Sequence, residues 1–207
     1  MERTGSKVVL VTSTIANEGK TTLSVNLALA LAQKEKRVLL LGCDLRNPSV
    51  ASAMGKEPGL GLSEYLTQKV NLEQILHHDN DPYLYTVYGG KLAGRPERLL
   101  TGREMKSLIA AARQKFDYII LDTPPCALMA DASEILTLAD CAVLTVRQNY
   151  ACRQQILEGV QVLSESDNPI LGCVISMNAS GISSGHAGSY GYYGGYGHYG
   201  EYGKTNG

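Results

Sequence analysis

Features that would direct this 207-residue chain to a membrane or to a nucleic acid are missing from its sequence. No apolar run reaches the roughly 18 residues that a membrane-spanning helix needs, and the start, MERTGSK, lacks the apolar core of a signal peptide. The formal net charge is −1, so no global field attracts nucleic acid or acidic lipid. We therefore expect no direct membrane insertion and no nucleic-acid partner.

The cysteines lack the spacing of a zinc site or a disulfide framework. They stand at Cys43, Cys126, Cys141, Cys152 and Cys173, none of them in a CxxC pair and several inside apolar runs. This pattern predicts small buried thiols in a reducing cytosol.

Short apolar runs alternate with helix-like stretches along the chain. We expect strands at Val8–Val11, Val38–Leu41, Leu84–Tyr88, Tyr118–Leu121, Ala142–Val146 and Ile170–Ser176. We expect helices at Thr22–Lys36, Leu62–Leu66, Leu72–His77, Pro96–Lys115 with a break near Thr101–Gly102, and about Ala151–Ser164. The alternation predicts an α/β fold, a parallel sheet flanked by helices on both faces, with the functional residues at the carboxyl ends of the strands.

The segment VLVTSTIANEGKTT joins the first expected strand to the first expected helix. Its Gly19-Lys20-Thr21 core, in this context, is typical of a P-loop, in which the lysine reaches the β- and γ-phosphates and the threonine hydroxyl binds Mg²⁺. The first glycine of the full GxxxxGK[ST] pattern is replaced by Thr14. We expect a P-loop NTPase-like fold that binds ATP and Mg²⁺. The nucleotide contacts expected in and around this core are Asn17, Glu18, Gly19, Lys20, Thr21 and Thr22.

Two further segments place carboxylates at strand ends. Asp122 ends IILD, where it can hold the Mg²⁺ directly or through water, and Asp44 and Arg46 follow the second strand. Asp44 can accept a proton or position the metal, and Arg46 can stabilise phosphate charge or fix Asp44. We expect Lys20, Asp44, Arg46 and Asp122 to be catalytic, and Thr21, Asp44 and Asp122 to bind the metal. The structural alternatives are a cap at Asp122 and an Asp44–Arg46 turn pair.

The last twenty residues, GSYGYYGGYGHYGEYGKTNG, contain half of the twelve tyrosines. Glycine costs the most backbone entropy to order, so we expect a disordered tail at 180–207 after a single P-loop domain at 1–179. By composition alone such a tail is filler or a self-association tract.

The ordered set VTSTIANEGKTT, LLLGCDLRNP, IILDTPP and a tyrosine cluster resembles the bacterial tyrosine kinases, P-loop proteins of capsule and exopolysaccharide systems. The resemblance implies an ATP-dependent protein-tyrosine kinase that phosphorylates its own tail, largely between subunits. It also implies rings of subunits and a membrane-embedded activator in trans, which would hold a cytoplasmic enzyme at the inner face of the bacterial membrane.

By the same resemblance, Ser13 corresponds to the loop serine of the family. In related P-loop ATPases an asparagine that ends the last strand contacts adenine, and Asn178 is the matching residue here, with a plain turn residue as the alternative. The phosphoacceptors that the resemblance implies are Tyr190, Tyr192, Tyr193, Tyr196, Tyr199 and Tyr202.

The chain departs from the family pattern at three places. Gly42 replaces the first aspartate of the family's Asp-x-Asp-x-Arg motif, and Ala16–Asn17 replaces Pro-Gly in the loop. Only MERTGSK precedes the first strand, where family members carry a helix that builds the ring, so ring and non-ring forms both stay open. Gly42 favours a second hypothesis, a nucleotide-binding regulatory module with little catalysis. A third, a positioning-type ATPase, is disfavoured because those relatives carry a lysine where this chain has Thr14.

Overall fold

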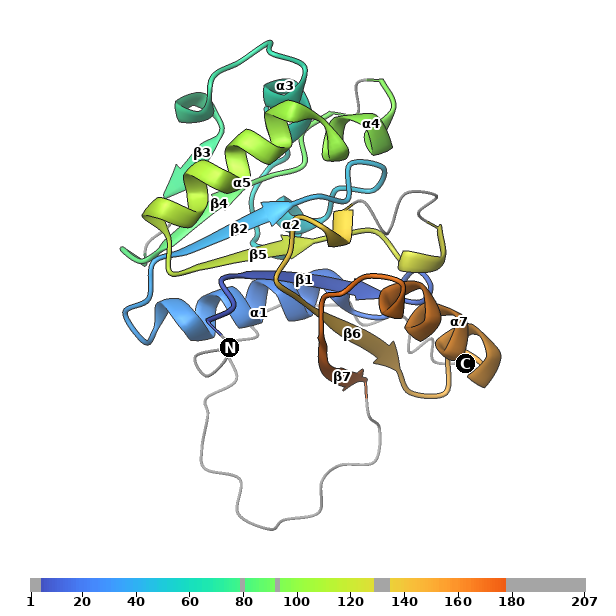
Figure 1. The fold of residues 1–207 in the computed structure, drawn as a ribbon. Coiled ribbons are helices and arrows are strands. Elements are labelled where there is room, and N and C mark those ends of the chain that lie inside the picture. The colour runs from blue at the N-terminus through green and yellow to red at the C-terminus, as the bar shows by residue number, and fades with distance from the viewer. Residues whose placement is uncertain (1–4, 79–80, 92–93, 129–134, 178–207) are drawn as a thin grey trace, which may run out of the picture.

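The computed structural model describes residues 5–78, 81–91, 94–128 and 135–177, which form a seven-stranded sheet with helices on both faces (Figure 1). The sheet order is β3-β4-β2-β5-β1-β6-β7, and β3 pairs antiparallel with β4 while the other pairs are parallel. The strands are β1 (Val8–Ser13), β2 (Val38–Gly42), β3 (Leu76–His78), β4 (Leu84–Val87), β5 (Tyr118–Asp122), β6 (Cys141–Arg147) and β7 (Ile170–Ser176).

The helices cover the two faces of the sheet unequally. One face packs on α1 (Lys20–Ala32) and α2 (Val50–Ala53). The other packs on α3 (Leu62–Leu66), α4 (Pro96–Thr101), α5 (Arg103–Lys115) and α7 (Arg153–Ser164). Two 3₁₀ turns, η1 (Leu72–Gln74) and η2 (Cys126–Leu128), complete the described elements.

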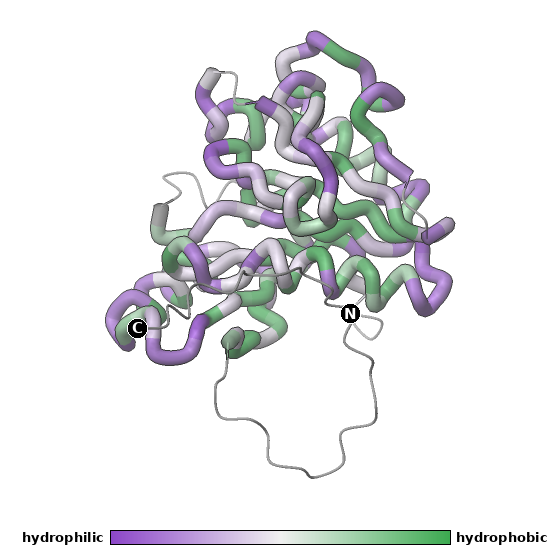
Figure 2. Tube along the Cα trace, turned by 180° about the vertical axis from the view of Figure 1, so that it is seen from behind, coloured by the Kyte–Doolittle hydropathy of each residue, from purple (hydrophilic) through white to green (hydrophobic). Residues whose placement is uncertain are grey.

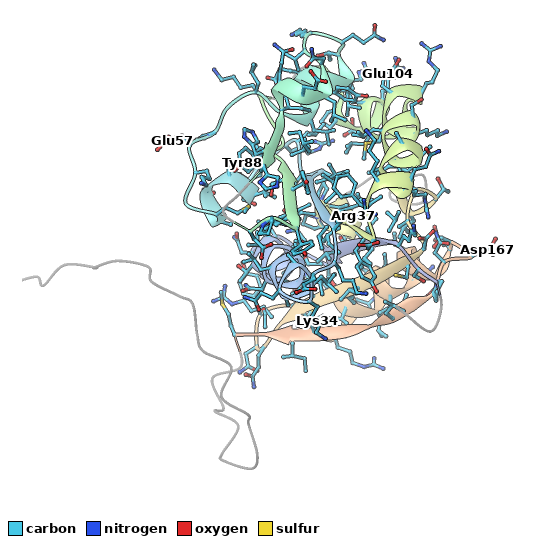
Figure 3. All side chains as sticks on the ribbon, turned by 90° about the vertical axis from the view of Figure 1, so that its left-hand side faces the viewer. Lys34, Arg37, Glu57, Tyr88, Glu104 and Asp167 are labelled. Atoms are coloured by element: carbon cyan, nitrogen blue, oxygen red, sulfur yellow. The ribbon has the colours of Figure 1, made fainter. Side chains whose placement is uncertain are left out.

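Alternation along the central strands explains why both faces are apolar. Val8 and Leu10 pack with α5 and α7, whereas Val9 and Val11 pack with α1. Successive side chains of a strand point to opposite faces, so an unbroken apolar run suits a strand that is buried on both sides. In Figure 2 the hydrophobic colour follows these inner strands, and in Figure 3 the charged residues Glu57 and Asp167 lie at the edges of the molecule.

The structure confirms the expected strands and most of the helices, and it corrects one segment. Leu72–His77 was expected to be helical, but the helical part ends at Gln74, and Leu76–His78 is a strand whose Leu76 pairs with Val87. Pairing with β4 decides the conformation of this edge segment, which is too short for its own periodicity to do so. For the same reason the sheet is not parallel throughout.

Two further expectations concern the ends of the chain and the membrane. Within the described ranges no helix is long and apolar enough to cross a bilayer. The expected tail unit at 180–207 lies outside the described residues, which end at Met177, one residue after β7. The six tyrosines proposed as acceptors therefore have no structural description, and neither does Asn178.

Candidate nucleotide and magnesium site

The loop between β1 and α1 presents its backbone to the carboxyl ends of the strands. Asn17 and Gly19 both have left-handed backbones, with φ of 63° and 87°. A Cβ atom added at Gly19 would lie 3.3 Å from Cβ and Oγ of Ser176, so glycine also allows β7 to approach the loop closely. A loop of this kind at the start of a thirteen-residue helix offers several N–H groups to an anion such as phosphate.

The buried side chain of Glu18 holds this loop in place. Its Oε2 accepts a hydrogen bond from the backbone N–H of Ile15 at 2.9 Å, and its Oε1 accepts one from the N–H of Arg147 at 3.2 Å. The hydroxyl of Ser176 donates to the backbone oxygen of Glu18 at 2.8 Å. Glu18 therefore joins the loop to the ends of β6 and β7, and only its backbone is left to face a nucleotide.

Ser13 has a similar internal role. It is fully buried, and its hydroxyl donates to the backbone oxygen of Ile15 at 2.6 Å. Neither Ser13 nor Glu18 is among the residues that line the cleft described below. Both residues were expected to contact the nucleotide. In the structure their side chains are buried and hydrogen-bonded within the loop, away from the cleft.

Thr14, at the position of the missing glycine, is fully buried below the loop. A Cβ atom added to Gly159 of α7 would lie 3.0 Å from Oγ1 of Thr14 and 3.2 Å from Sγ of Cys126. A glycine in α7 thus provides the space that the threonine occupies. Within the described part of the chain, the Thr14 hydroxyl has no hydrogen-bond partner.

Oxygen atoms from three elements meet at the start of α1. Thr21 donates its hydroxyl proton to Oδ2 of Asp122 at 2.8 Å, and Ser24 donates to Oδ1 at 3.0 Å. The Oγ of Ser49 lies 2.7 Å from Oγ1 of Thr21. Lys20, which is 8% exposed, lies at the same helix end.

Burial dominates the electrostatics of Asp122, which is 1% exposed. Desolvation raises the pKa of its carboxyl group to about 6, although the hydrogen bonds from Thr21 and Ser24 and the charge of Lys20 oppose this rise. A buried carboxylate of this kind gains from a cation beside it.

These residues fit a magnesium ion that is shared with a nucleotide. Mg²⁺ prefers oxygen ligands and usually keeps several waters, binding through one or two carboxylates together with phosphate oxygens. Thr21 and Asp122 offer such oxygens beside the loop. Among the described residues no group of three or more His, Cys, Asp and Glu could hold a metal ion.

Asp44 and Arg46 follow the carboxyl end of β2, beside the loop. Asp44 is 8% exposed, and its Oδ1 accepts a hydrogen bond from the N–H of Asn47 at 3.0 Å, which closes a local turn. Arg46 forms an ion pair with Glu97 of α4 rather than with Asp44. Both residues line the cleft, so the turn and the ion pair orient side chains that still face a ligand.

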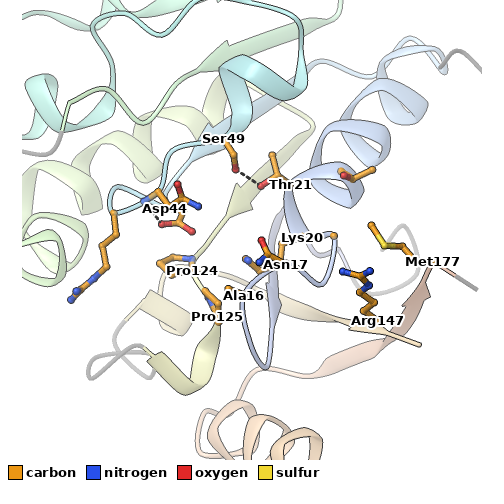
Figure 4. Close-up of a pocket in the computed structure, with 14 residues that line it drawn as sticks. Ala16, Asn17, Lys20, Thr21, Asp44, Ser49, Pro124, Pro125, Arg147 and Met177 are labelled. Carbon is orange, nitrogen blue, oxygen red and sulfur yellow. Dashed lines mark hydrogen bonds between the residues drawn. The ribbon is translucent and has the colours of Figure 1, made fainter. Parts of the chain in front are cut away.

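A cleft of about 410 Å³ brings together most of the predicted site residues, although Ser13, Glu18 and Asp122 are not among those that line it. Figure 4 shows Asp44 and Ser49 on one side of Lys20, and Arg147 and Met177 on the other. The lining residues are Ala16, Asn17, Gly19, Lys20, Thr21, Thr22, Asp44, Arg46, Asn47, Ser49, Pro124, Pro125, Arg147 and Met177. A smaller cavity of about 260 Å³ adjoins it between α1 and β7 and includes Leu23, Asn26 and Thr145.

Comparison with known proteins now identifies the family. A sequence-family profile described as an AAA domain matches residues 6–173. Tyrosine-protein kinase YwqD of Bacillus subtilis (strain 168) is 35% identical over 170 residues, which are 82% of this chain and 72% of that protein. Tyrosine-protein kinase CpsD of Streptococcus agalactiae is 35% identical over 188 residues, 89% of this chain and 82% of CpsD. This chain belongs to the bacterial tyrosine-protein kinases.

Solved kinase domains share the fold of this tyrosine kinase. The kinase domain of VpsO is 32% identical with a TM-score of 0.78, over 84% of this chain and 85% of that structure. The kinase domain of the Escherichia coli tyrosine kinase ETK is 28% identical with a TM-score of 0.77, over 93% and 74%. The septum site-determining protein MinD from Pyrococcus horikoshii, solved with Mg-ADP, is 22% identical with a TM-score of 0.69 and shares the fold alone.

Among the cleft residues that sequence reasoning missed are Ser49 and Arg147, which lie on either side of the loop. Ser49 belongs to no motif, and its contact with Thr21 depends on how α2 packs against α1. Arg147 ends β6, and its guanidinium lies 4.6 Å from the ring centroid of Tyr150. A strand end adjoining the P-loop strand was the available signal for Arg147, because β1 and β6 are neighbours in the sheet.

Proposed function

We propose that this kinase uses Mg·ATP to phosphorylate the tyrosines of its own C-terminal segment, largely between copies of the chain. One observation carries the proposal: the chain leaves β7 at Met177, which lines the cleft that holds Lys20, Thr21 and Asp44. The six tyrosines at 190–202 follow within 25 residues. A glycine-rich connection of this length has ample reach for a neighbouring cleft.

The cleft has two distinct ends that suggest how ATP lies in it. The end with Thr21, Ser49 and Asp44 offers oxygen atoms and suits the metal and the γ-phosphate. The opposite end, with Arg147 and Met177, suits the nucleoside. We propose that the phosphates lie over the backbone of Gly19 and Thr21 between these ends, with Lys20 on the β- and γ-phosphates.

The transfer itself needs positioning and charge stabilisation more than covalent chemistry. The tyrosine oxygen attacks the γ-phosphorus, the bond from that phosphorus to the β–γ bridging oxygen breaks, ADP leaves, and the phenolic proton passes to Asp44. Tyrosine has a pKa near 10, so an acceptor for this proton is needed at neutral pH. When bound, Mg²⁺ would neutralise developing phosphate charge. Arg46, held by its ion pair with Glu97, adds a further positive charge at the end of the cleft that suits the metal.

The biological setting is proposed from the family. We propose that the enzyme serves capsular or extracellular polysaccharide synthesis and export, and that a membrane-embedded activator binds it in trans at the inner face of the bacterial membrane. Each added phosphate brings about −1.5 to −2 charges, so a fully loaded tail would repel neighbouring tails and loosen an assembly of copies.

A second candidate is a nucleotide-binding module with weak kinase activity. Gly42 favours it, because one carboxylate of the family motif is absent beside Asp122. A general base contributes about 10²–10⁴-fold, so a site with Asp44 alone would still transfer phosphate, but slowly.

Intact-mass measurement and peptide mapping after incubation with Mg·ATP test the proposal. Wild type should gain phosphate on tail tyrosines, and Lys20→Met, which removes the cation from the loop, should gain none. Nucleotide binding without phosphate transfer would support the second candidate, the nucleotide-binding module with weak kinase activity. ATP hydrolysis without phosphotyrosine, or label confined to serine and threonine, would reject the kinase assignment.

A further inference from the structure

The proton count at Thr21 fixes the direction of its hydrogen bond with Ser49. The Thr21 hydroxyl has one proton, which it donates to Oδ2 of Asp122 at 2.8 Å. The 2.7 Å contact between the Thr21 and Ser49 oxygens therefore requires Ser49 to be the donor. Thr21 thus lies in the middle of a directed chain that runs from Ser49 through Thr21 to Asp122.

This direction leaves a single lone pair on Thr21 for a metal. A hydroxyl oxygen has two lone pairs, and one of them accepts the proton of Ser49. We propose that Ser49 is a positioning residue that fixes the rotation of the Thr21 hydroxyl, so that its remaining lone pair is held ready for Mg²⁺ in the cleft. The inference rests on the proposed Mg·ATP site and adds a residue to it.

The local role usually expected of Ser49 does not explain its side chain. Ser49 occupies the N-cap position of α2, where serine normally accepts a hydrogen bond from the first turn. Its side chain makes no such bond, and its backbone oxygen instead accepts one from the hydroxyl of Ser52 at 3.0 Å. The Ser49 hydroxyl thus serves the neighbouring helix α1 rather than its own.

Ser49 also connects two loops that must act on the same phosphate. It follows the segment that contains Asp44 and Arg46, and its partner Thr21 opens α1. A metal held at Thr21 is therefore sensitive to the position of the Asp44 segment. Outer residues that orient a metal ligand typically change metal affinity while the ligands themselves remain in place.

The test measures Mn²⁺ affinity in the presence of ATP by electron paramagnetic resonance, and ATP affinity in EDTA by calorimetry. Ser49→Ala should weaken Mn²⁺ binding about 10-fold or more, the range seen when such orienting residues are removed, while ATP affinity in EDTA stays unchanged. Ser49→Thr keeps a donor and should remain close to wild type. Ser164→Ala, which removes a helical hydroxyl that contacts neither Ser49 nor the cleft, is the control and should bind Mn²⁺ like wild type.

Unchanged Mn²⁺ affinity in Ser49→Ala would overturn the inference. An equal loss of ATP affinity in EDTA would do so too, as would a Ser49→Thr variant as weak as the alanine. Should the alanine variant not fold, Ser49→Gly, which also lacks the hydroxyl and is well tolerated at an N-cap position, replaces it under the same expectations. If wild type itself binds no Mn²⁺ with ATP, the proposed metal site is rejected together with the inference. If wild type binds Mn²⁺ normally and Ser49→Ala binds it equally well, only the inference is rejected.

Discussion

Gly42 lies directly across from Asp122 on the paired strands β2 and β5. A Cβ atom added at Gly42 would lie 3.0 Å from the backbone nitrogen of Gly89 and 3.3 Å from a methyl group of Val50. Gly42 stands where the family has its first aspartate. The segment that follows β4 approaches Gly42 so closely that it occupies the space an aspartate side chain would need.

Restoring that aspartate is expected to harm this protein. Gly42→Asp forces the backbone near Gly89 to move and places a second carboxylate beside the buried Asp122, so it should lower the free energy of unfolding by roughly 1–3 kcal/mol and should not raise kinase activity. Urea unfolding and phosphotyrosine assays measure the two effects.

Gly42→Ala separates the two causes, because it adds the Cβ atom without the charge. Gly42→Ala should therefore show most of the loss in unfolding free energy that is expected for Gly42→Asp. An increase in transfer rate for Gly42→Asp at unchanged stability would contradict this account and favour the weak-kinase module.

The contact between α7 and the loop gives a second prediction. Gly159→Ala should lower the free energy of unfolding by about 1–3 kcal/mol, the usual cost of overpacking a tight contact, because the new methyl group meets Thr14 and Cys126. It should also weaken ATP binding, since Thr14 lies under the loop. Thermal or urea unfolding and calorimetry check both effects.

A double-mutant cycle tests whether Thr14 is the cause. Thr14→Ala removes the hydroxyl and methyl groups that the Gly159→Ala methyl would meet, so the double variant should recover part of the lost stability. Strictly additive losses would show that the two residues do not interact.

Asp140 gives a prediction with a pH dependence. Its carboxylate accepts hydrogen bonds from the N–H groups of Lys7 and Val8, both at 2.8 Å, and from Arg113 at 2.6 and 2.9 Å. Burial raises the pKa of Asp140, but the bonds from Arg113 and from the two backbone N–H groups outweigh it, so the pKa lies below its usual value. The stabilisation is present above the pKa of an unfolded aspartate, about 3.9, and is lost as the pH falls through the lower folded value.

Asp140→Asn should therefore lower the free energy of unfolding by roughly 1–2 kcal/mol at pH 7, the low end of the range for hydrogen bonds to a charged group because the pair is partly solvated. The difference from wild type should shrink below pH 4. Asp117→Asn, at a more exposed pair with Arg37, is the control and should cost less. A difference between wild type and Asp140→Asn that is the same at pH 3 and pH 7 would contradict the charge-based explanation.

Most of the fold was predictable because the signal was local. Runs such as VVLV and YIIL are buried on both faces and contact two apolar clusters, so composition alone identified them as strands. The strand Leu76–His78 was not predictable in this way, because its conformation comes from pairing with β4 at the edge of the sheet.

The candidate site was predictable only where a motif specifies chemistry. Lys20, Thr21 and Asp122 lie together as expected, because a P-loop and a strand-end carboxylate have fixed positions in this topology. The inward direction of Glu18 and the contact of Ser49 with Thr21 depend on how separate loops pack. No spacing in the sequence reports such packing.

A mixture of two complementary variants, one without a working cleft and one without acceptor tyrosines, tests the central claim most directly. One chain carries Lys20→Met with its six tail tyrosines intact, and the other has a wild-type cleft with all six tail tyrosines changed to phenylalanine. Incubated with Mg·ATP, neither chain alone should gain tail phosphotyrosine, and the mixture should gain it on the Lys20→Met chain. A mixture that stays free of phosphotyrosine, while wild type is equally unlabelled, would contradict the claim that this cleft phosphorylates that tail.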